Sequence, residues 1–476
     1  MSEEVKLKIG LEIHQQLDTH KLFCNCHSLL RNDTPLFEVK RKLHAVAGET
    51  GEIDKAALHE SSLNKEFVYQ GYDTTCLVEL DEQPPLLINE EALEIALHVS
   101  LLLNCEIIPV SQIMRKTVID GSNTSGFKRT VLIARNGFID TEHGRVGIEN
   151  ISLEEDAARI IEEEPIKRIF RLDRLGIPLV EIGTKPDIKT AEQCKKIALF
   201  IGDVLRSCKV KRGIGTIRQD INISIANHPR VEIKGFQDVK MFIPVIEKEI
   251  ERQKKNILQK KLVGDVRNAL ANGETEFLRP MPGASRMYPE TDLPLLKISR
   301  DIINNAKKTL PKLRSEVKQE LIKKGLIEDE VRVLLKQGML EEFSALLKLM
   351  NEPRFIYRIL IEIPKSIASR ERKSIEEINE ILTLDIIESI IDYVRQNKIN
   401  KDNVKHVMEQ IAKGKKFEDA IKIEKFDLTN VETEIAKLVK DKPGLTIGGY
   451  MGLIMNKFKG KISGKEASEI LKKMLK

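Results

Sequence analysis

An alternating stretch near the N-terminus restricts the fold of this chain more than any other feature. Residues 6–17 read K-L-K-I-G-L-E-I-H-Q-Q-L, so apolar residues alternate there with other residue types. A period of two predicts a β-strand with one apolar face. Glu12 and His14 then point to the same side, about 7 Å apart along the strand. A carboxylate and an imidazole on one face suit a divalent-metal site or an acid–base pair, although a solvated strand face has the same pattern.

Four further segments place polar or charged side chains along predicted strands. They are residues 151–158 (I-S-L-E-E-D-A-A), 177–183 (I-P-L-V-E-I-G), 216–225 (T-I-R-Q-D-I-N-I-S-I) and 231–234 (V-E-I-K). In the third segment Arg218, Asp220 and Asn222 share one face. In the fourth, Glu232 and Lys234 do the same. Such a face is expected to meet water or a ligand.

Carboxylates in the first two of these segments extend the candidate site. Glu181 is a lone carboxylate in an apolar run, and such a group is seldom buried without a partner. Glu154, Glu155 and Asp156 are consecutive, so at least one of them faces the core side. Together with Glu12 and His14 of the first strand, these groups can provide oxygen and imidazole ligands. Hard oxygen ligands favour Mg²⁺ or Mn²⁺.

Composition and missing motifs narrow the class of protein. The chain has 476 residues and six cysteines, too few for a disulfide framework, which favours a reducing cytoplasm. No window approaches 18 apolar residues, so no membrane-spanning helix is expected. The phosphate-binding G-x-x-x-x-G-K-[ST] loop and the G-x-S-x-G nucleophile elbow are both absent. Cys24 and Cys26 are spaced as the start of a zinc site, but no second Cys pair follows nearby, which argues against zinc.

The pattern of predicted elements divides the chain into three parts. Up to about residue 295, strand-like alternations mix with helices predicted over residues 89–104, 190–208 and 238–260. After Pro294 the spacing is helical. Ser374 with Glu377, and Ser463 with Glu466, form helix-opening capping boxes. We therefore predict an α+β chain with a mixed α/β cradle domain over 1–295, an all-helical domain over 296–405 and a small helical tail over 406–476.

The predicted tail carries most of the positive charge. Residues 401–476 contain 17 Lys and no Arg against 11 acidic residues, whereas the first 400 residues sum to about −1. A basic end on a near-neutral body suggests a polyanionic partner. A solvated, Lys-rich helical surface is the other interpretation of this composition.

Several long motifs resemble one family, the subunits of tRNA-dependent amidotransferases. The motifs are G-L-E-I-H-Q-Q-L-D (10–18), K-L-F-C-N-C (21–26), L-E-E-D-A-A (153–158), R-L-G-I-P-L-V-E-I (174–182) and I-R-Q-D-I-N-I-S (217–224). Two more resemble the archaeal E subunits of glutamyl-tRNA(Gln) amidotransferase, in the GatB/GatE family, more than the bacterial B subunits. They are I-D-G-S-N-T-S-G-F-K-R-T (119–130) and R-P-M-P-G-A-S-R-M-Y-P-E-T-D (279–292).

The resemblance implies a cytoplasmic enzyme that uses ATP and Mg²⁺. Members of this family phosphorylate the γ-carboxylate of glutamate carried by tRNA(Gln), and ammonia then displaces the phosphate. The partner implied is an asparaginase-like glutaminase, the D subunit, in a heterotetramer without a membrane. The alternatives are a B-type subunit that acts on Glu-tRNA(Gln) or Asp-tRNA(Asn) with an amidase partner, and a tRNA-binding scaffold without catalysis.

The resemblance also assigns roles by position. Glu12, His14, Glu155 and Glu181 match the family's catalytic, Mg²⁺-binding cluster. The residues expected to bind substrate or ATP are Glu154, Arg218, Asp220, Asn222 and Lys234. The tail is expected to bind tRNA, and we predict that its contacts with phosphates come from Lys457, Lys459, Lys461 and Lys465.

One departure from the family pattern concerns an inserted domain. E subunits usually carry a domain that resembles one of aspartyl-tRNA synthetase. Only about two dozen residues, 252–276, remain for it here, and their composition predicts helix. We therefore expect this domain to be missing.

Overall fold

The computed structural model describes residues 6–45, 47, 51–53, 55–142, 144–213, 215–236, 238–281, 287–421, 428–457 and 464–474. The chain forms two compact units, residues 1–314 and residues 315–476. The first unit contains strands and helices, and the described part of the second contains helices only. The predicted α+β class is confirmed. The three-part division at 295 and 405 stays a prediction.

A large mixed sheet dominates the first unit. Its strands lie in the order β15-β14-β13-β12-β1-β11-β8-β7-β6-β16, and β4 pairs with β7. Pairing is antiparallel except between β13 and β14. The strands are β1 (Lys8–Gln16), β4 (Glu106–Ile107), β6 (Ile113–Thr117), β7 (Phe127–Thr141), β8 (Gly144–Glu155), β11 (Pro178–Thr184), β12 (Ile217–Ser224), β13 (Val231–Lys234), β14 (Asp265–Ala269), β15 (Thr275–Pro280) and β16 (Met287–Pro289).

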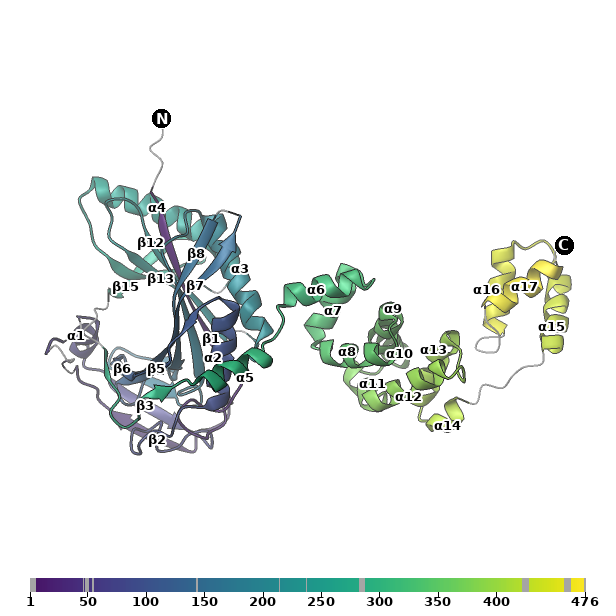
Figure 1. Ribbon diagram of the computed structural model, residues 1–476, viewed down its shortest axis with the longest axis horizontal. Helices are drawn as coiled ribbons and strands as arrows, with labels where there is room; N and C mark the ends of the chain where they lie inside the picture. The colour runs from purple at the N-terminus through teal and green to yellow at the C-terminus, as the bar shows by residue number, and fades with distance from the viewer. Residues whose placement is uncertain are drawn as a thin grey trace. The chain divides into compact units, whose positions relative to one another are not determined.

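The alternation of the first stretch places β1 inside this sheet. Ile9, Leu11 and Ile13 are at most 1% exposed and belong to the core between sheet and helices. Helices α2, α3 and α4 lie along that face of the sheet (Figure 1). The opposite face carries the polar residues of β1 and its neighbours, so it is the face available to a ligand.

The helices of the first unit begin largely where the sequence predicts. Asn89 caps α2 by accepting from the Ala92 amide, and Thr190 caps α3 by accepting from the Gln193 amide. Gln193 does not complete the capping box, because its side chain accepts from the Lys189 amide. The helical segments are α1 (Lys55–Ser62), α2 (Glu90–Leu102), α3 (Ala191–Ser207), η1 (Val239–Met241), α4 (Phe242–Leu258) and α5 (Arg300–Lys308).

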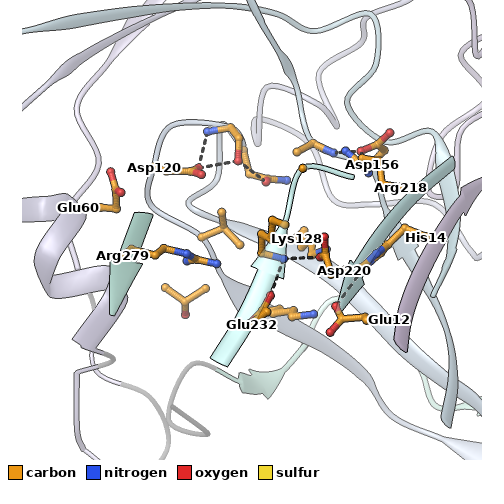
Figure 2. A pocket seen from close by; sticks show the side chains of 18 of the residues that line it. Glu12, His14, Glu60, Asp120, Lys128, Asp156, Arg218, Asp220, Glu232 and Arg279 are labelled. Atoms are coloured by element: carbon orange, nitrogen blue, oxygen red, sulfur yellow. Dashed lines mark hydrogen bonds and ion pairs between the residues drawn. The ribbon is translucent and has the colours of Figure 1, made fainter. Parts of the chain in front are cut away.

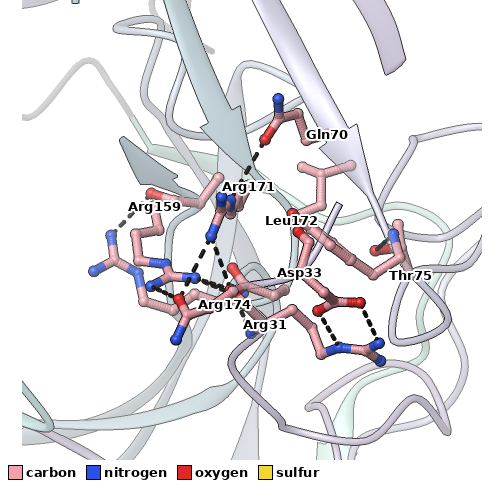
Figure 3. A network of polar contacts seen from close by, with 12 residues as sticks. Arg31, Asp33, Gln70, Thr75, Arg159, Arg171, Leu172 and Arg174 are labelled. Carbon is pink, nitrogen blue, oxygen red and sulfur yellow. Dashed lines mark hydrogen bonds and ion pairs between the residues drawn. The ribbon is translucent and has the colours of Figure 1, made fainter. Parts of the chain in front are cut away.

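Two smaller sheets complete the unit. One has the order β2-β3-β10-β9, and β5 pairs with β17 in the other. An arginine network beside the four-stranded sheet holds the loop before β2 in place (Figure 3). Buried Asp173 accepts from the Arg31 amide at 2.8 Å and from the Arg159 guanidinium at 2.6 Å. The strands are β2 (Phe37–Arg41), β3 (Glu66–Gly71), β5 (Val110–Ser111), β9 (Arg159–Glu163), β10 (Lys167–Arg171) and β17 (Leu296–Lys297).

The helix predicted over residues 252–276 is wrong beyond Leu258. After α4 the chain forms β14 and β15, which pair antiparallel at the edge of the large sheet. The turn between them contains Asn272 and Gly273, and Gly273 has a φ of +84°. An Asn-Gly pair is a strong hairpin signal, and it outweighs the helix-favouring composition around it.

The second unit contains two hydrophobic clusters. Helices α6 to α14 surround the larger one, and α15 to α17 supply the smaller, around Ile435, Tyr450 and Leu471. The predicted Ser374–Glu377 capping box is present, whereas Ser463 lies outside the described residues. The helices are α6 (Arg314–Lys323), α7 (Glu328–Gln337), α8 (Leu340–Leu349), α9 (Pro353–Tyr357), the π-helical η3 (Arg358–Glu362), α10 (Ile363–Glu371), α11 (Ile375–Ile381), α12 (Leu384–Arg395), η4 (Lys401–Asn403), α13 (Val404–Ala412), α14 (Phe417–Ala420), α15 (Leu428–Asp441), α16 (Ile447–Lys457) and α17 (Gly464–Met474).

Among the described residues, no helix has the length and apolar composition needed to cross a membrane.

Candidate active site

The centre of the site lies where β1 runs between β11 and β12. His14 is opposite Glu181 on one neighbour and Arg218 on the other, and Glu12 is opposite Asp220. Residues directly opposite in a sheet share a face, so the register brings the predicted polar positions together. They line a cavity of about 600 Å³ on the face of the sheet opposite α2, α3 and α4, or lie just behind the wall of that cavity (Figure 2).

Three of the four predicted metal ligands meet at this centre. The His14 Nε2 atom lies 3.5 Å from Glu12 Oε1 and 3.4 Å from Glu181 Oε2. One potential ligand atom from each residue lies within 4.8 Å of the other two. Glu12 and His14 line the cavity directly. The set therefore offers two carboxylates and one imidazole to a single ion.

The three groups differ in acidity. Burial would lower the pKa of His14, but its hydrogen bond with Glu181 and the charges of Glu181 and Glu12 raise it above its usual value. Burial would raise the pKa of Glu181, but Lys116 and His14 hold it well below the usual range. Burial and the neighbouring Glu181 raise the pKa of Glu12. The site thus contains one firmly ionised carboxylate beside a more basic one.

An unpaired oxygen supports the fit of a cation. Asn222 Oδ1 is buried, and within the described part of the chain it has no hydrogen-bond partner. It belongs to the cavity wall. A buried acceptor without a partner is costly unless a ligand or ion satisfies it. Oxygen ligands at a cavity open to water suit Mg²⁺, which keeps several waters when it is bound to proteins.

Glu155, the fourth predicted metal ligand, is not brought to this centre. It follows Glu154 on β8, so the two side chains leave on opposite faces. The Glu155 carboxylate accepts from the Arg129 amide at 2.9 Å, and Arg129 also bonds Glu290 at 2.8 Å. Glu155 is therefore held in a separate ion-pair cluster.

Glu154 lies behind the cavity wall. Its carboxylate is 1% exposed and pairs with Lys116 at 3.0 Å and with Lys128. Lys116 also lies 3.5 Å from Glu181, and both lysines line the cavity. Glu154 thus positions two cations beside the metal-ligand set. Sequence reasoning missed Lys116 and Lys128, because their strands become neighbours of the site only through the register of β6, β7 and β8.

The remaining predicted residues of β12 and β13 also face the cavity. Lys234 bonds the carboxylates of Asp220 and Glu232, and these raise its pKa against the effect of burial. Arg218 donates to Asp156 Oδ1 at 2.7 Å. Most of the predicted substrate-binding residues are therefore together in the folded chain.

Asp156 is the buried anchor of Arg218. It is 1% exposed and accepts from Gln16 at 2.7 Å as well as from Arg218. Burial would raise its pKa, but Arg218 and Arg174 lower it below the usual value. Its place at the end of a three-residue acidic run was the only sequence signal for it.

A second cluster forms around the cysteines. Cys24, Cys26, Cys76 and Glu79 offer ligand atoms that all lie within 4.8 Å of one another. Glu79 also pairs with the fully buried Lys21. Three thiols and a carboxylate are residue types that zinc accepts. The folded chain thus brings Cys76 and Glu79 to Cys24 and Cys26, in place of the second Cys pair that the sequence lacks.

The four tail lysines are only partly described. Lys457 ends α16, is 52% exposed and pairs with Glu434 at 3.3 Å. Lys459 and Lys461 lie outside the described residues. Lys465 lies in α17, but its side chain is likewise outside them. Their contact with tRNA stays a prediction.

Comparison with known proteins gives consistent matches. Residues 7–304 match the family model described as "GatB/GatE catalytic domain". Archaeal proteins named as the E subunit of glutamyl-tRNA(Gln) amidotransferase are similar over the whole chain. That of Methanocaldococcus jannaschii is 35% identical, over 100% of this chain and 99% of its own length. Those of Methanosarcina acetivorans and Archaeoglobus fulgidus are each 33% identical, over 98% of their own length and 99% and 100% of this chain.

The relatives are longer than this chain. The alignment with the M. jannaschii protein spans 629 positions, 153 more than the 476 residues present here. That protein therefore contains residues, enough for a whole domain, that have no counterpart in this chain. The difference agrees with the expected loss of an inserted domain. In this structure only Gln259–Gly264 separates α4 from β14.

Proposed function

The chain belongs to the GatB/GatE family, and from this membership we propose that it is the E subunit of a glutamyl-tRNA(Gln) amidotransferase. In the proposed reaction, an oxygen of the glutamyl γ-carboxylate attacks the γ-phosphorus of ATP. The bond to the β-phosphate oxygen breaks and ADP leaves. Ammonia then attacks the activated carbonyl carbon, the carbon–oxygen bond to phosphate breaks, and loss of a proton gives Gln-tRNA(Gln). The nucleotide, the carboxylate and the acyl phosphate are all anions, so the site that binds them needs positive charge.

The observation that carries this proposal is that the potential ligand atoms of Glu12, His14 and Glu181 lie together at one end of a large polar cavity. These three residues would hold Mg²⁺. When bound, the ion supplies positive charge for the phosphates that react. The orphan oxygen of Asn222 provides a further acceptor in the same wall.

The cations of the wall would hold the anionic substrates in place. Lys116 and Lys128 are fixed by Glu154, and Lys234 by Asp220 and Glu232, so their ammonium groups are oriented before a substrate arrives. Pre-oriented charges stabilise developing negative charge without reorganisation at the moment of reaction. The Arg218 guanidinium is likewise oriented in advance, by its hydrogen bond to Asp156.

The source of ammonia is proposed to be a partner chain. The sequence contains no recognisable amidase or asparaginase nucleophile motif. The names of the similar archaeal proteins favour the E type, and hence an asparaginase-like D subunit, over a B-type subunit with an amidase partner. A heterotetramer in the cytoplasm is the proposed assembly.

The test is turnover by the purified chain with Mg²⁺, ATP and Glu-tRNA(Gln). We expect Gln-tRNA(Gln) to form with ammonium chloride as the nitrogen donor, and not with glutamine until the D subunit is added. Absence of ATP-dependent turnover with ammonia would favour the scaffold alternative. Glutamine-dependent turnover by the isolated chain would contradict the partner assignment.

A further inference from the structure

The cations that line the cavity are not equivalent. Lys116 and Lys128 pair with Glu154, Arg218 pairs with Asp156, and Lys234 pairs with two carboxylates. Each of these positive charges is therefore at least partly neutralised by a carboxylate of the same unit. These cations can orient a substrate, but the paired carboxylates cancel much of the positive charge that would attract an anion.

Arg279 and Arg230 differ from them. Both line the same cavity, and neither side chain has a hydrogen bond or an ion pair with any described residue. Glu60, which lines the cavity near Arg279 in Figure 2, is paired with Arg168 at 3.5 Å. Arg230 is exposed and Arg279 half-buried. Arg279 therefore brings to a partly enclosed space a guanidinium that is not paired with a carboxylate of any described residue.

The backbone around Arg279 directs its side chain. On β15, Arg279 is opposite Val266, but the next residue of β14, Arg267, is opposite Phe277, so Leu278 is an extra residue. Such a bulge re-aims the neighbouring side chain and is frequent beside active sites. Pro280 follows, which restricts Arg279 to an extended conformation. The strand is thus fixed on both sides of Arg279.

The side chain lies across the cavity from the metal-ligand set. Figure 2 shows the Arg279 guanidinium pointing into the cavity from one side, with Glu12 and His14 on the other. An anionic substrate that is bound to a cation held by Glu12, His14 and Glu181, and that extends across the cavity, approaches Arg279. A guanidinium is suited to phosphate, because its fork of N–H donors matches two phosphate oxygens.

We infer that Arg279 is a phosphate-binding residue of this cavity, supported by Arg230 at its rim. The inference rests on the proposed function, which supplies two sources of phosphate: the polyphosphate of ATP and the phosphodiesters at the 3′ end of the tRNA. Either source presents the same chemistry to the guanidinium.

The experiment compares Arg279→Gln with wild type and with Lys261→Gln. Lys261 is an exposed residue of the loop before β14, and its substitution removes the same charge outside the cavity. Calorimetric titration with sodium tripolyphosphate, and separately with ATP, gives binding without turnover. For Arg279→Gln we expect about 10- to 100-fold weaker binding of the phosphate source that it contacts. Lys261→Gln should remain within about two-fold of wild type, since it loses only a screened surface charge.

Steady-state kinetics with ammonia then separate the two sources. A raised KM for ATP with an unchanged KM for Glu-tRNA(Gln) identifies the nucleotide, and the reverse identifies the tRNA. Arg279→Lys, which keeps the charge without the fork, should be intermediate, and unchanged melting of the variants excludes misfolding. Wild-type affinity for tripolyphosphate and ATP, with both KM values unchanged in Arg279→Gln, would overturn the inference. If wild type shows no turnover, the proposed function fails, while the titrations still decide whether Arg279 binds tripolyphosphate or ATP.

Discussion

His14 and Glu181 are opposite each other on β1 and β11, and their side chains meet with 3.4 Å between Nε2 and Oε2. The two residues are 167 positions apart in the sequence. Their contact links the first motif of the chain to an isolated carboxylate in an apolar run. It also sets the pKa shifts from which the pH dependence of the site follows.

The first prediction concerns pH in the absence of metal. The pKa of His14 is raised in the folded chain, so its stabilising effect is complete below the unfolded value of about 6.5 and is lost as pH rises through the folded value. In EDTA, the difference in unfolding free energy between wild type and His14→Ala should therefore be larger at pH 6 than at pH 9. Because a bound metal needs the neutral imidazole, Mg²⁺ affinity should rise over the same range.

Urea unfolding at the two pH values measures the first effect, and an NMR titration of His14 measures its pKa directly. A pKa below 6.5 for His14 in the metal-free protein would contradict the proposed interaction with Glu181.

The second prediction concerns the buried anchor of Arg218. Asp156→Ala should destabilise the first unit by about 2 kcal/mol, because it removes a buried carboxylate that accepts charge-assisted and amide hydrogen bonds from Arg218 and Gln16. The matched control is Asp140→Ala. Asp140 pairs with Arg145 on the same sheet, but both side chains are at least 60% exposed, so the expected loss is below about 1 kcal/mol. Equal losses in the two variants, measured by denaturant unfolding, would show that Asp156 is not an important anchor.

The third prediction concerns the three-helix tail. Residues 428–476 contain 10 Lys and 5 acidic residues, and their helices share one hydrophobic cluster. Deleting all three helices removes that cluster completely, whereas a cut at Asp441 would leave α15 without its partners. The deletion should raise the KM for Glu-tRNA(Gln). Each lost phosphate contact should reduce the slope of log K against log salt by somewhat under one unit.

Chemistry with ammonia should survive the tail deletion at saturating Glu-tRNA(Gln), because the first unit has its own core. An unchanged KM and salt slope would show that the lysines form only a solvated surface.

Much of the site could be predicted from the alternation of residues along single strands. Glu12 with His14, and Arg218 with Asp220, share faces because a strand has a period of two. The partners of those residues required the register between strands, which the sequence does not reveal. Lys116 and Lys128 were missed for this reason. Glu155 was grouped with the metal ligands although its neighbour Glu154 takes the face toward the site.

The fold shows the same limit. Helices with strong capping residues, such as Asn89 and Thr190, begin where predicted. The stretch after Leu258 was interpreted by composition, and the hairpin at Asn272 and Gly273 was missed. Cys76 could not be placed beside Cys24 and Cys26, because Cys26 and Cys76 are 50 positions apart in the sequence.

The most direct test of the account is the rate of Gln-tRNA(Gln) formation by His14→Ala, with saturating ATP, Mg²⁺, Glu-tRNA(Gln) and ammonium chloride. Losing a group that stabilises charge at a reacting phosphate typically lowers the rate by about 10²–10³. We predict a loss of that size with folding and tRNA affinity intact, whereas His44→Ala, at an exposed histidine, should match wild type. A folded His14→Ala variant that turns over within a few-fold of wild type would contradict the assignment of this site.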